Sequence, residues 1–316
     1  MNQIADDRIT SGATGRHGTG GWFRGLLVLA ALLVSPGAAA EAVQVDYLGK
    51  TLNGQLQWAP DSTSREIVLL VHDTADHAES PVMTTLQQGL AEAGINSLAI
   101  TLSRGRNDRR GPLDCDDLSE SSHTQGIEEI GAWFDWLYRR DITPVNFLGH
   151  GRGANQVAWF LADSEHPAFE RLALLSPMTW DREAVAADYR ERFGESLHDV
   201  YRRAQEIAEE QGGSARLEGV GFLHCEDADV AVADFLEYYY DERRFHTPEL
   251  LDDVGLPTLV LHGEADASSP NLREAMAAGD WAHVRFVELT GGDYTAEPTR
   301  AEMLEQMVDF FTTNDD

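Results

Sequence analysis

The segment VNFLGHGRGANQVA, residues 145–158, determines the fold prediction. It begins with a short apolar run typical of a buried strand and ends with the start of an amphipathic helix. Gly149, Gly151 and Gly153 lie between the two halves, and small residues there allow the chain to turn sharply. A strand, a tight turn and a helix in this order lift the side chain of residue 151 into a crevice at the end of the strand.

Similar short apolar runs recur along the chain. Near-continuous apolar runs of this length are typical of strands in a parallel sheet that is covered on both faces. Their alternation with amphipathic stretches, such as 84–93 and 126–138, predicts a doubly wound, mostly parallel α/β sheet with its crevice at the carboxyl ends of the strands. Residues 43–47 and 52–58 predict an antiparallel hairpin at the sheet edge. The runs are 67–72, 97–102, 145–149, 172–176, 258–262 and 284–289.

Residues 177–247 interrupt this alternation. The pattern there is mostly helical, with one strand-like run at 217–223 and a helix that ends in Tyr238, Tyr239 and Tyr240. Because the stretch lies between two predicted sheet strands, we interpret it as a helical cap inserted over the crevice. We expect the tyrosines to pack the cap onto the body, and the alternative is that they line a substrate or ligand cavity.

The first 40 residues have the pattern of an export signal. Three arginines precede nine apolar residues at 26–34, and Ala38, Ala39 and Ala40 follow. Nine residues are too few to cross a bilayer as a helix, and the small residues are typical of a cleavage site. We therefore predict a signal peptide at 1–40 and a periplasmic or secreted domain at 41–316, free of the membrane after cleavage. An uncleaved membrane anchor is the alternative.

The charge of the chain is strongly acidic. Asp and Glu outnumber Lys and Arg by 54 to 24, which gives a net charge of −30, and Lys50 is the only lysine. Residues 1–40 hold three of the arginines and two of the aspartates, so residues 41–316 carry a net charge of −31. Such a surface repels phosphate backbones, which excludes nucleic acid as a partner, and it indicates adaptation to high salt.

The chain has two cysteines, Cys115 and Cys225. In an oxidising compartment an even pair is a candidate disulfide. Two free, buried thiols are the alternative, because one pair has no spacing pattern. The spacing does not match a zinc site.

The turn at 149–153 resembles the nucleophile elbow of the α/β-hydrolase superfamily, and the resemblance covers most of 66–311. The runs LLVHD at 69–73 and PTLVLHGEAD at 257–266 support it. The resemblance implies that positions 151, 266 and 294 correspond to the catalytic triad. It also places Asp73, Thr74 and Arg152 at the oxyanion hole, and His72, His77 and His150 in the crevice.

Two triad positions depart from the family pattern. Gly151 stands where the family carries a nucleophile, and glycine has no atom that attacks a carbonyl. Tyr294 stands where a histidine is usual, and a phenol with a pKa near 10 is no general base at neutral pH. Asp266 matches the triad carboxylate. Asp73 replaces a glycine that is usual beside the oxyanion hole, and its carboxylate would oppose the negative charge that develops there.

Two alternatives would restore a catalytic group. Ser176 and Ser97 are the serines nearest the predicted crevice. A divalent metal would also generate a nucleophile, although no helical H-x-x-x-H pair fixes two ligands on one face. The histidines 123, 246 and 283 have no identifiable partner, and we expect them on the surface or in the cap. The metal ligands would come from His72, Asp73, Asp76, His77, His150 and Asp266.

These features together predict an exported pseudo-hydrolase. We expect it to bind a small molecule or a protein partner in the capped crevice, without a cofactor or metal. The alternative is an active hydrolase of small esters or amides that uses a non-standard nucleophile or a metal.

Overall fold

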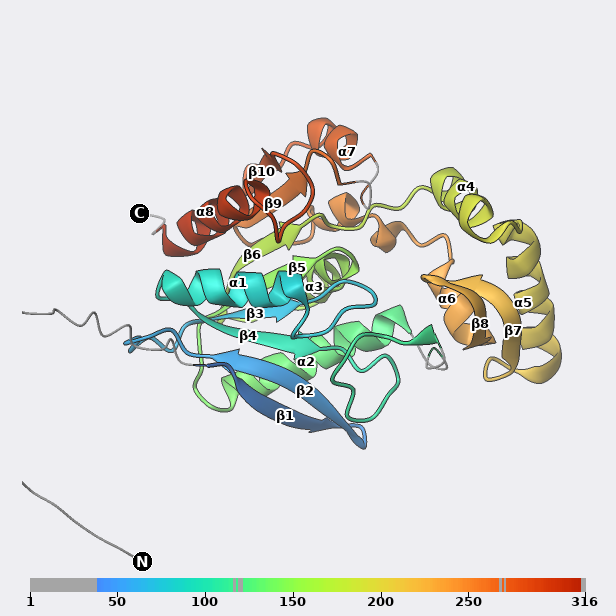
Figure 1. Cartoon of the computed structure of the whole chain (residues 1–316), viewed down its shortest axis with the longest axis horizontal. Helices are drawn as coiled ribbons and strands as arrows, with labels where there is room; N and C mark the ends of the chain where they lie inside the picture. Colours follow the sequence, from blue (N-terminus) through green and yellow to red (C-terminus); the bar gives the residue numbers. More distant parts are fainter. Residues whose placement is uncertain (1–38, 116–117, 119–121, 267–268, 270, 314–316) are drawn as a thin grey trace, which may run out of the picture. The chain divides into compact units, whose positions relative to one another are not determined.

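The computed structural model describes residues 39–115, 118, 122–266, 269 and 271–313. The predicted signal peptide lies outside these residues, except for Ala39 and Ala40. The body is built on an eight-stranded sheet in the order β1-β2-β4-β3-β5-β6-β9-β10 (Figure 1). Its strands are β1 (Glu41–Tyr47), β2 (Lys50–Gln57), β3 (Ile67–Val71), β4 (Asn96–Thr101), β5 (Val145–His150), β6 (Phe169–Leu175), β9 (Thr258–Gly263) and β10 (Val284–Leu289).

The strand pairings confirm the predicted sheet. The pairs from β4 through β3, β5, β6 and β9 to β10 are all parallel. β1 pairs with β2, and β2 with β4, in antiparallel fashion, so the predicted hairpin forms one edge. Because β3, β5, β6 and β9 run in parallel, the loops that follow them meet at one edge of the sheet.

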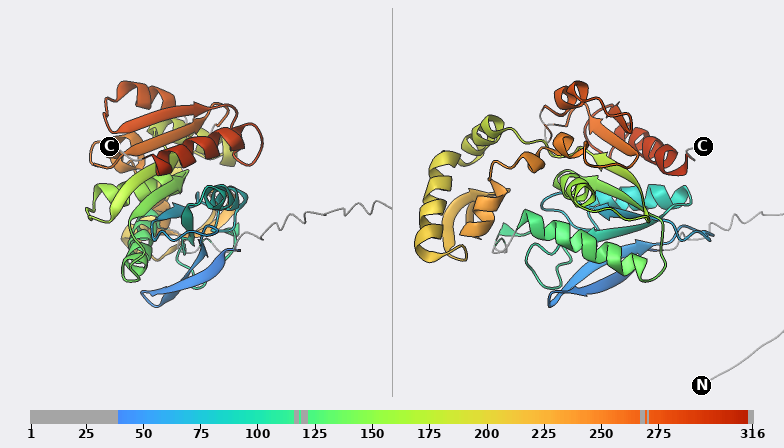
Figure 2. Two further views of the ribbon diagram at one scale, coloured as in Figure 1. Left: turned by 90° about the vertical axis from the view of Figure 1, so that its left-hand side faces the viewer. Right: turned by 180° about the vertical axis from the view of Figure 1, so that it is seen from behind.

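Helices cover both faces of the sheet, as the continuous apolar strands require. Figure 2, right, shows α2 and α3 in front of the sheet when the molecule is seen from behind. The face with α2, α3 and α7 packs around residues such as Trp133, Phe147 and Val157. The opposite face, with α1 and α8, packs around Met83, Leu148 and similar residues. The helices are α1 (Pro81–Glu92), α2 (His123–Tyr138), α3 (Arg152–Ala162), α7 (Leu272–Ala278) and α8 (Thr299–Thr312).

The segment between β6 and β9 contains an insertion, residues 182–238, with its own apolar core. It contains the predicted helices, but it also contains β8, which the sequence did not reveal and which pairs with β7 in antiparallel fashion. Cys225 on β8 is disulfide-bonded to Cys115 in the loop after β4. The elements of the insertion are α4 (Arg182–Phe193), α5 (Leu197–Gln211), β7 (Arg216–Phe222), β8 (Cys225–Ala231) and α6 (Val232–Tyr238).

The chain returns to the body earlier than the predicted boundary at residue 247. The short helices η2 (Arg243–Phe245) and η3 (Thr247–Leu250) follow the insertion, and Phe245 and Leu250 belong to the core of the body. Asn155 on α3 holds them, because its side-chain amide donates to the carbonyl of Arg244 at 2.7 Å.

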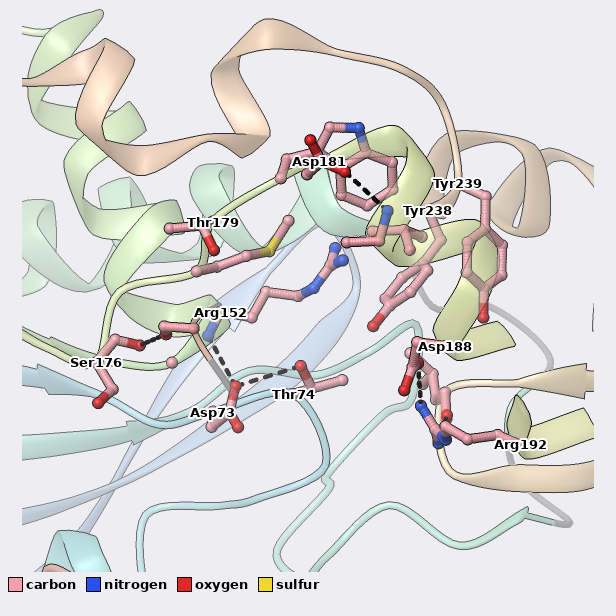
Figure 3. A pocket seen from close by; sticks show the side chains of 17 residues that line it. Asp73, Thr74, Arg152, Ser176, Thr179, Asp181, Asp188, Arg192, Tyr238 and Tyr239 are labelled. Atoms are coloured by element: carbon pink, nitrogen blue, oxygen red, sulfur yellow. Dashed lines mark hydrogen bonds and ion pairs between the residues drawn. The ribbon is translucent and has the colours of Figure 1, made fainter. Parts of the chain in front are cut away.

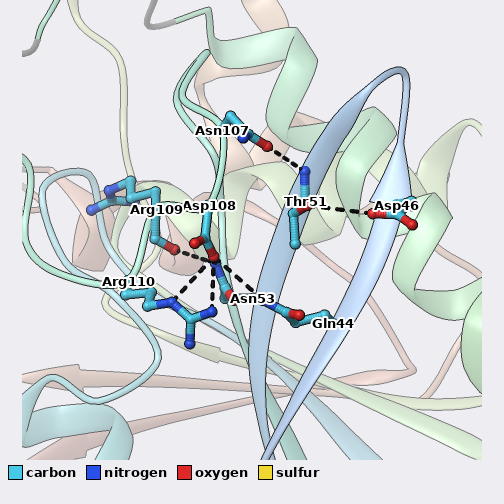
Figure 4. Close-up of polar contacts among 8 residues, drawn as sticks. All are labelled: Gln44, Asp46, Thr51, Asn53, Asn107, Asp108, Arg109 and Arg110. Carbon is cyan, nitrogen blue, oxygen red and sulfur yellow. Dashed lines mark hydrogen bonds and ion pairs between the residues drawn. The ribbon is translucent and has the colours of Figure 1, made fainter.

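The loop after β4 is fastened to the edge hairpin (Figure 4). Asp108 Oδ1 accepts hydrogen bonds from the side chains of Asn53 at 3.0 Å and Gln44 at 3.3 Å. The Thr51 N–H donates to Asn107 Oδ1 at 2.7 Å, and the Asp108 N–H donates back to the Thr51 carbonyl at 3.0 Å. These bonds fix the path of residues 102–113.

Across the described part of the chain, no helix is long and apolar enough to cross a membrane.

Candidate functional site

The turn between β5 and α3 keeps the sharp geometry that the glycines predicted. Gly151 has φ 56° and ψ −121°, a conformation that side-chain-bearing residues rarely adopt. A Cβ at Gly153 would lie 2.2 Å from the His72 carbonyl oxygen, so only glycine allows α3 to approach β3 this closely. The elbow is therefore preserved while its central side chain is lost.

The carboxylate of Asp73 occupies the space next to Gly151. A Cβ on Gly151 would lie 2.3 Å from both Cγ and Oδ1 of Asp73. Asp73 Oδ1 accepts the backbone N–H of Arg152 at 2.7 Å and the hydroxyl of Thr74 at 3.3 Å. The Arg152 N–H, which the resemblance assigned to the oxyanion hole, therefore already holds a negatively charged oxygen of the protein itself.

The imidazole of His72 fixes the backbone of Asp73 through a hydrogen bond. Its Nε2 accepts the Leu102 N–H at 3.1 Å, so its Nδ1 carries the proton and donates to the Asp73 carbonyl at 2.6 Å. His72 is fully buried, and burial, reinforced by the charge of Arg109, lowers its pKa well below the usual value. His72 is therefore a neutral residue that positions Asp73 and has no access to a ligand.

Tyr294 occupies the position of the expected histidine, and its buried hydroxyl is engaged in hydrogen bonds to neighbouring residues. Its hydroxyl donates to Asp266 Oδ2 at 2.8 Å, accepts the Gly263 N–H at 3.1 Å and contacts Ser176 Oγ. Burial raises the pKa of Tyr294 far above its usual value. The phenol therefore stays protonated and does not serve as a general base.

Ser176 directly follows β6 and is one of the two serines considered as a substitute nucleophile. It adopts φ 43°, its Oγ lies 3.5 Å from His262 Nδ1, and its carbonyl accepts the Ser269 hydroxyl at 2.9 Å. Ser97 lies inside β4, where its Oγ accepts from the Gln87 amide at 3.3 Å. Of the two serines, only Ser176 lines the pocket described next.

A pocket of about 360 Å³ lies between the strand ends of the body and the insertion (Figure 3). The body contributes its floor, and the insertion contributes apolar and aromatic side chains together with the charged side chains of Asp188 and Arg192. Figure 3 shows the side chain of Arg152 extending from the start of α3 towards Tyr238. The lining consists of Asp73, Thr74, Gly151, Arg152, Ser176, Met178, Thr179, Trp180, Asp181, Ala184, Val185, Asp188, Arg192, Leu223, Tyr238, Tyr239 and Ser269.

The structure brings only some of the predicted site residues to this pocket. Asp73, Thr74, Gly151 and Arg152 line it, whereas Asp266 and Tyr294 lie behind Ser176 and are not part of the described lining. The three histidines predicted in the crevice are also outside the lining. His72 is buried, and the His150 ring packs against Tyr294, with ring centres 5.7 Å apart.

The predicted metal ligands do not gather at one point. Among the described residues, no three of these side chains place ligand atoms within 4.8 Å of one another. Cys115, His224 and Cys225 do meet this criterion, but both thiols are consumed by the disulfide. The described residues therefore offer no metal centre beside the elbow.

Two buried residues that interact with Arg152 were missed or misplaced in the sequence analysis. His123, which we expected on the surface or in the cap, begins α2 and is buried, and its Nδ1 accepts Nη1 of Arg152 at 3.0 Å. Arg104, in the loop after β4, is also buried, with 3% of its surface exposed. A signal existed, because residues 103–111 hold four arginines in a strongly acidic chain.

Comparisons with known proteins bear on the fold. No protein-family model matches the sequence, and no curated protein is significantly similar to it. Many solved structures are similar in fold. Est1E from Butyrivibrio proteoclasticus with ferulic acid bound has a TM-score of 0.62 at 17% identity, over 85% of this chain and 98% of that one.

Two further structures agree with this likeness. A soluble variant of monoglyceride lipase from Saccharomyces cerevisiae has a TM-score of 0.62 at 11% identity, over 87% of this chain and 95% of that one. An alpha-beta serine hydrolase homologue from Coxiella burnetii has a TM-score of 0.51 at 14% identity, over 85% and 95% of the two chains. The sequence resemblance is thus confirmed at the level of fold, and the chain has the α/β-hydrolase fold.

Proposed function

We propose that this chain is a pseudo-hydrolase that binds a small organic molecule in the pocket beneath the insertion. The observation that carries the proposal is the position of the Asp73 carboxylate. It stands where a side chain at 151 would stand, and it holds the Arg152 N–H at 2.7 Å. The fold is that of hydrolases, but position 151 carries no nucleophile, and the N–H that would stabilise the oxyanion is already bonded to Asp73.

The electrostatic effect of Asp73 supports a role other than ester cleavage. Acyl transfer forms an oxyanion, and loss of a single oxyanion donor in known hydrolases reduces the rate by about 10²–10³. In this chain the donor is engaged by a carboxylate, which would also repel the developing charge. The pocket itself remains, and its lining combines aromatic and apolar side chains with polar and charged ones, which suits an organic molecule that carries a polar group.

Hydrolysis through Ser176 is the second candidate, because this serine lines the pocket and has a strained backbone. The hydrogen-bond partners of Ser176 do not provide a general base for this reaction. The hydroxyl of Tyr294 is already directed to Asp266, and His262 lies at 3.5 Å, the limit of a hydrogen bond. We therefore assign Ser176 to the structural network that holds β6 and β9 together.

We also propose that the protein works outside the cytoplasm. The disulfide between Cys115 and Cys225 supports this, because such bonds persist in oxidising compartments. The predicted signal sequence at 1–40 supports it independently. Detection of the processed chain in a periplasmic or secreted fraction tests this part of the proposal.

The function is tested by measuring binding and turnover on the same full-length protein. Ferulic acid is the first ligand to titrate, because a structure of similar fold holds it. Turnover is measured with p-nitrophenyl acetate and butyrate, with Ser176→Ala as the matched variant. We expect saturable ligand binding and no turnover above the rate of Ser176→Ala. Turnover that Ser176→Ala abolishes would establish the second candidate instead.

A further inference from the structure

Arg104 is a buried cation whose guanidinium has no hydrogen-bond partner among the residues that the structure describes. It is 3% exposed, and in the described part of the structure none of its three guanidinium nitrogens has a hydrogen-bond partner. Arg104 also adopts φ 52°, a left-handed conformation that costs energy in a residue with a side chain. A cation buried in this way is expensive unless something supplies the missing negative charge.

The protein holds Arg104 in place. The same loop is fastened to the edge hairpin through Asn107 and Asp108 (Figure 4). Arg109, five residues further on, is anchored by hydrogen bonds from its guanidinium to the carbonyls of Leu102, Ala75 and Asp76. Arg104 is therefore kept inside the molecule by the attachment of its loop, and not by a bond of its own.

Arg152 is a second buried cation, and it faces the pocket. It is 4% exposed, and its guanidinium lies 3.7 Å from the centre of the Tyr238 ring. Its Nη1 donates to the neutral His123, and neither Arg152 nor Arg104 forms an ion pair with a carboxylate among the described residues. Burial lowers the pKa of Arg104 to about 10, with the charge of Arg152 as the next cause, so Arg104 keeps its charge at neutral pH.

The nearby carboxylates are engaged elsewhere. Asp73 accepts the backbone N–H of Arg152, and not its guanidinium. Glu129 is buried, and its two oxygens accept the N–H and the hydroxyl of Ser103. The charges of Asp73 and Glu129 act on Arg104 as well, but neither carboxylate is hydrogen-bonded to its guanidinium. Two guanidinium groups without a carboxylate partner among the described residues thus lie near each other in a chain whose net charge is −30. Guanidinium groups are the preferred protein partners of carboxylate and phosphate groups.

We propose that the inner end of the pocket binds the anionic group of a small organic acid. The guanidinium of Arg152, which lines the pocket, is its direct partner, and Arg104 adds a second positive charge. The apolar part of the ligand contacts the aromatic side chains that line the same pocket, Trp180, Tyr238 and Tyr239. Figure 3 shows the two tyrosines. This inference rests on the proposed function and names the class of ligand.

The test compares a matched pair of ligands of nearly equal shape, 3-phenylpropanoate and the neutral 3-phenylpropanamide. Binding of each to the full-length protein is measured by calorimetry in a buffer low in chloride. The wild type is compared with Arg104→Met and Arg152→Met. Arg139→Met is the control, because this residue directly follows α2 and its side chain is 75% exposed. We expect the carboxylate to bind the wild type at least about tenfold more tightly than the amide. Arg104→Met and Arg152→Met should each remove this preference. Arg139→Met keeps it.

The stability of the ligand-free protein gives an independent readout. Arg104→Met removes a buried charge without breaking a hydrogen bond, so we expect its Tm to rise by about 2 °C or more. A lower Tm in Arg104→Met, with the carboxylate preference unchanged, would identify Arg104 as a structural residue and overturn the inference. Equal binding of the carboxylate and the amide would overturn the inference but leave the proposed function intact. Absence of binding by either ligand also overturns the inference, whereas turnover of esters is what overturns the proposed function.

Discussion

Replacing Gly151 by alanine perturbs the feature on which the account depends. The new Cβ would lie 2.3 Å from Cγ and Oδ1 of Asp73, closer than real Cβ contacts. The backbone at 151 has φ 56°, so alanine is also strained there. The carboxylate must therefore move away from the Arg152 N–H, which it now holds at 2.7 Å.

The cost follows from these two effects. Left-handed backbone strain in a residue with a side chain amounts to about 1–2 kcal/mol. Loss of a hydrogen bond to a charged group costs about 1.5–3 kcal/mol. The sum of about 3–5 kcal/mol corresponds to a decrease in Tm of roughly 6–15 °C in a domain of this size.

The assay is thermal unfolding of Gly151→Ala beside two controls. Gly194→Ala also places a side chain at positive φ, 72°, although with ψ 0° instead of the −121° of Gly151. Its Cβ would meet no atom within 4 Å, so it reports backbone strain without a clash. The double variant Gly151→Ala/Asp73→Ala removes the clash, and we expect it to be more stable than Gly151→Ala. The reasoning is refuted if Gly151→Ala costs no more than Gly194→Ala, or if removing the Asp73 carboxylate restores no stability.

Three further predictions concern solution conditions. Burial holds the pKa of His72 and His123 well below the value in the unfolded chain. Their contribution to stability is therefore complete above about pH 6.5 and is lost as the pH falls. Thermal unfolding at pH 7 and pH 5.5, with His123→Gln beside the wild type, measures this loss. Reduction of the Cys115–Cys225 bond, which spans 110 residues, should lower the stability by up to about 4–5 kcal/mol and weaken ligand binding, and calorimetry with and without reductant tests both effects. Because the net charge is −30, raising the salt from about 0.1 M to 1 M should raise the Tm, and a flat salt profile would contradict the predicted adaptation to high salt.

The strands of the sheet and the tight turn could be predicted because patterns within short stretches of sequence indicate them. Continuous apolar runs such as 67–72 and 258–262 predict buried parallel strands, and the glycines at 149, 151 and 153 predict the turn. Strand β8 was missed because CEDADVA has three acidic residues and only three buried ones, at 225, 228 and 230, and its partner β7 is needed to recognise it. The end of the insertion was set too late because Phe245 packs on a body core that the sequence does not display.

The chemistry of the pocket depended on contacts between distant segments. The sequence placed Asp73 near the oxyanion hole, but only the structure shows its bond to the Arg152 N–H, 79 residues away. The burial of Arg104 results from the attachment of its loop to the hairpin at Thr51 and Asn53, which local propensity does not encode. His123 was misplaced for the same reason, since its burial results from packing against α3 and Phe245.

Labelling with a fluorophosphonate, which reacts with activated serines, tests the central claim most directly. The full-length protein is treated with the reagent, and peptide mass spectrometry locates any adduct. The variant Asp73→Gly/Gly151→Ser/Tyr294→His serves as the positive control. The account predicts no adduct on the natural chain, because Gly151 offers no nucleophile and Ser176 has no activated base, and an adduct at position 151 of the variant. An adduct on Ser176 of the natural chain would contradict the account and show that this pocket performs hydrolase chemistry.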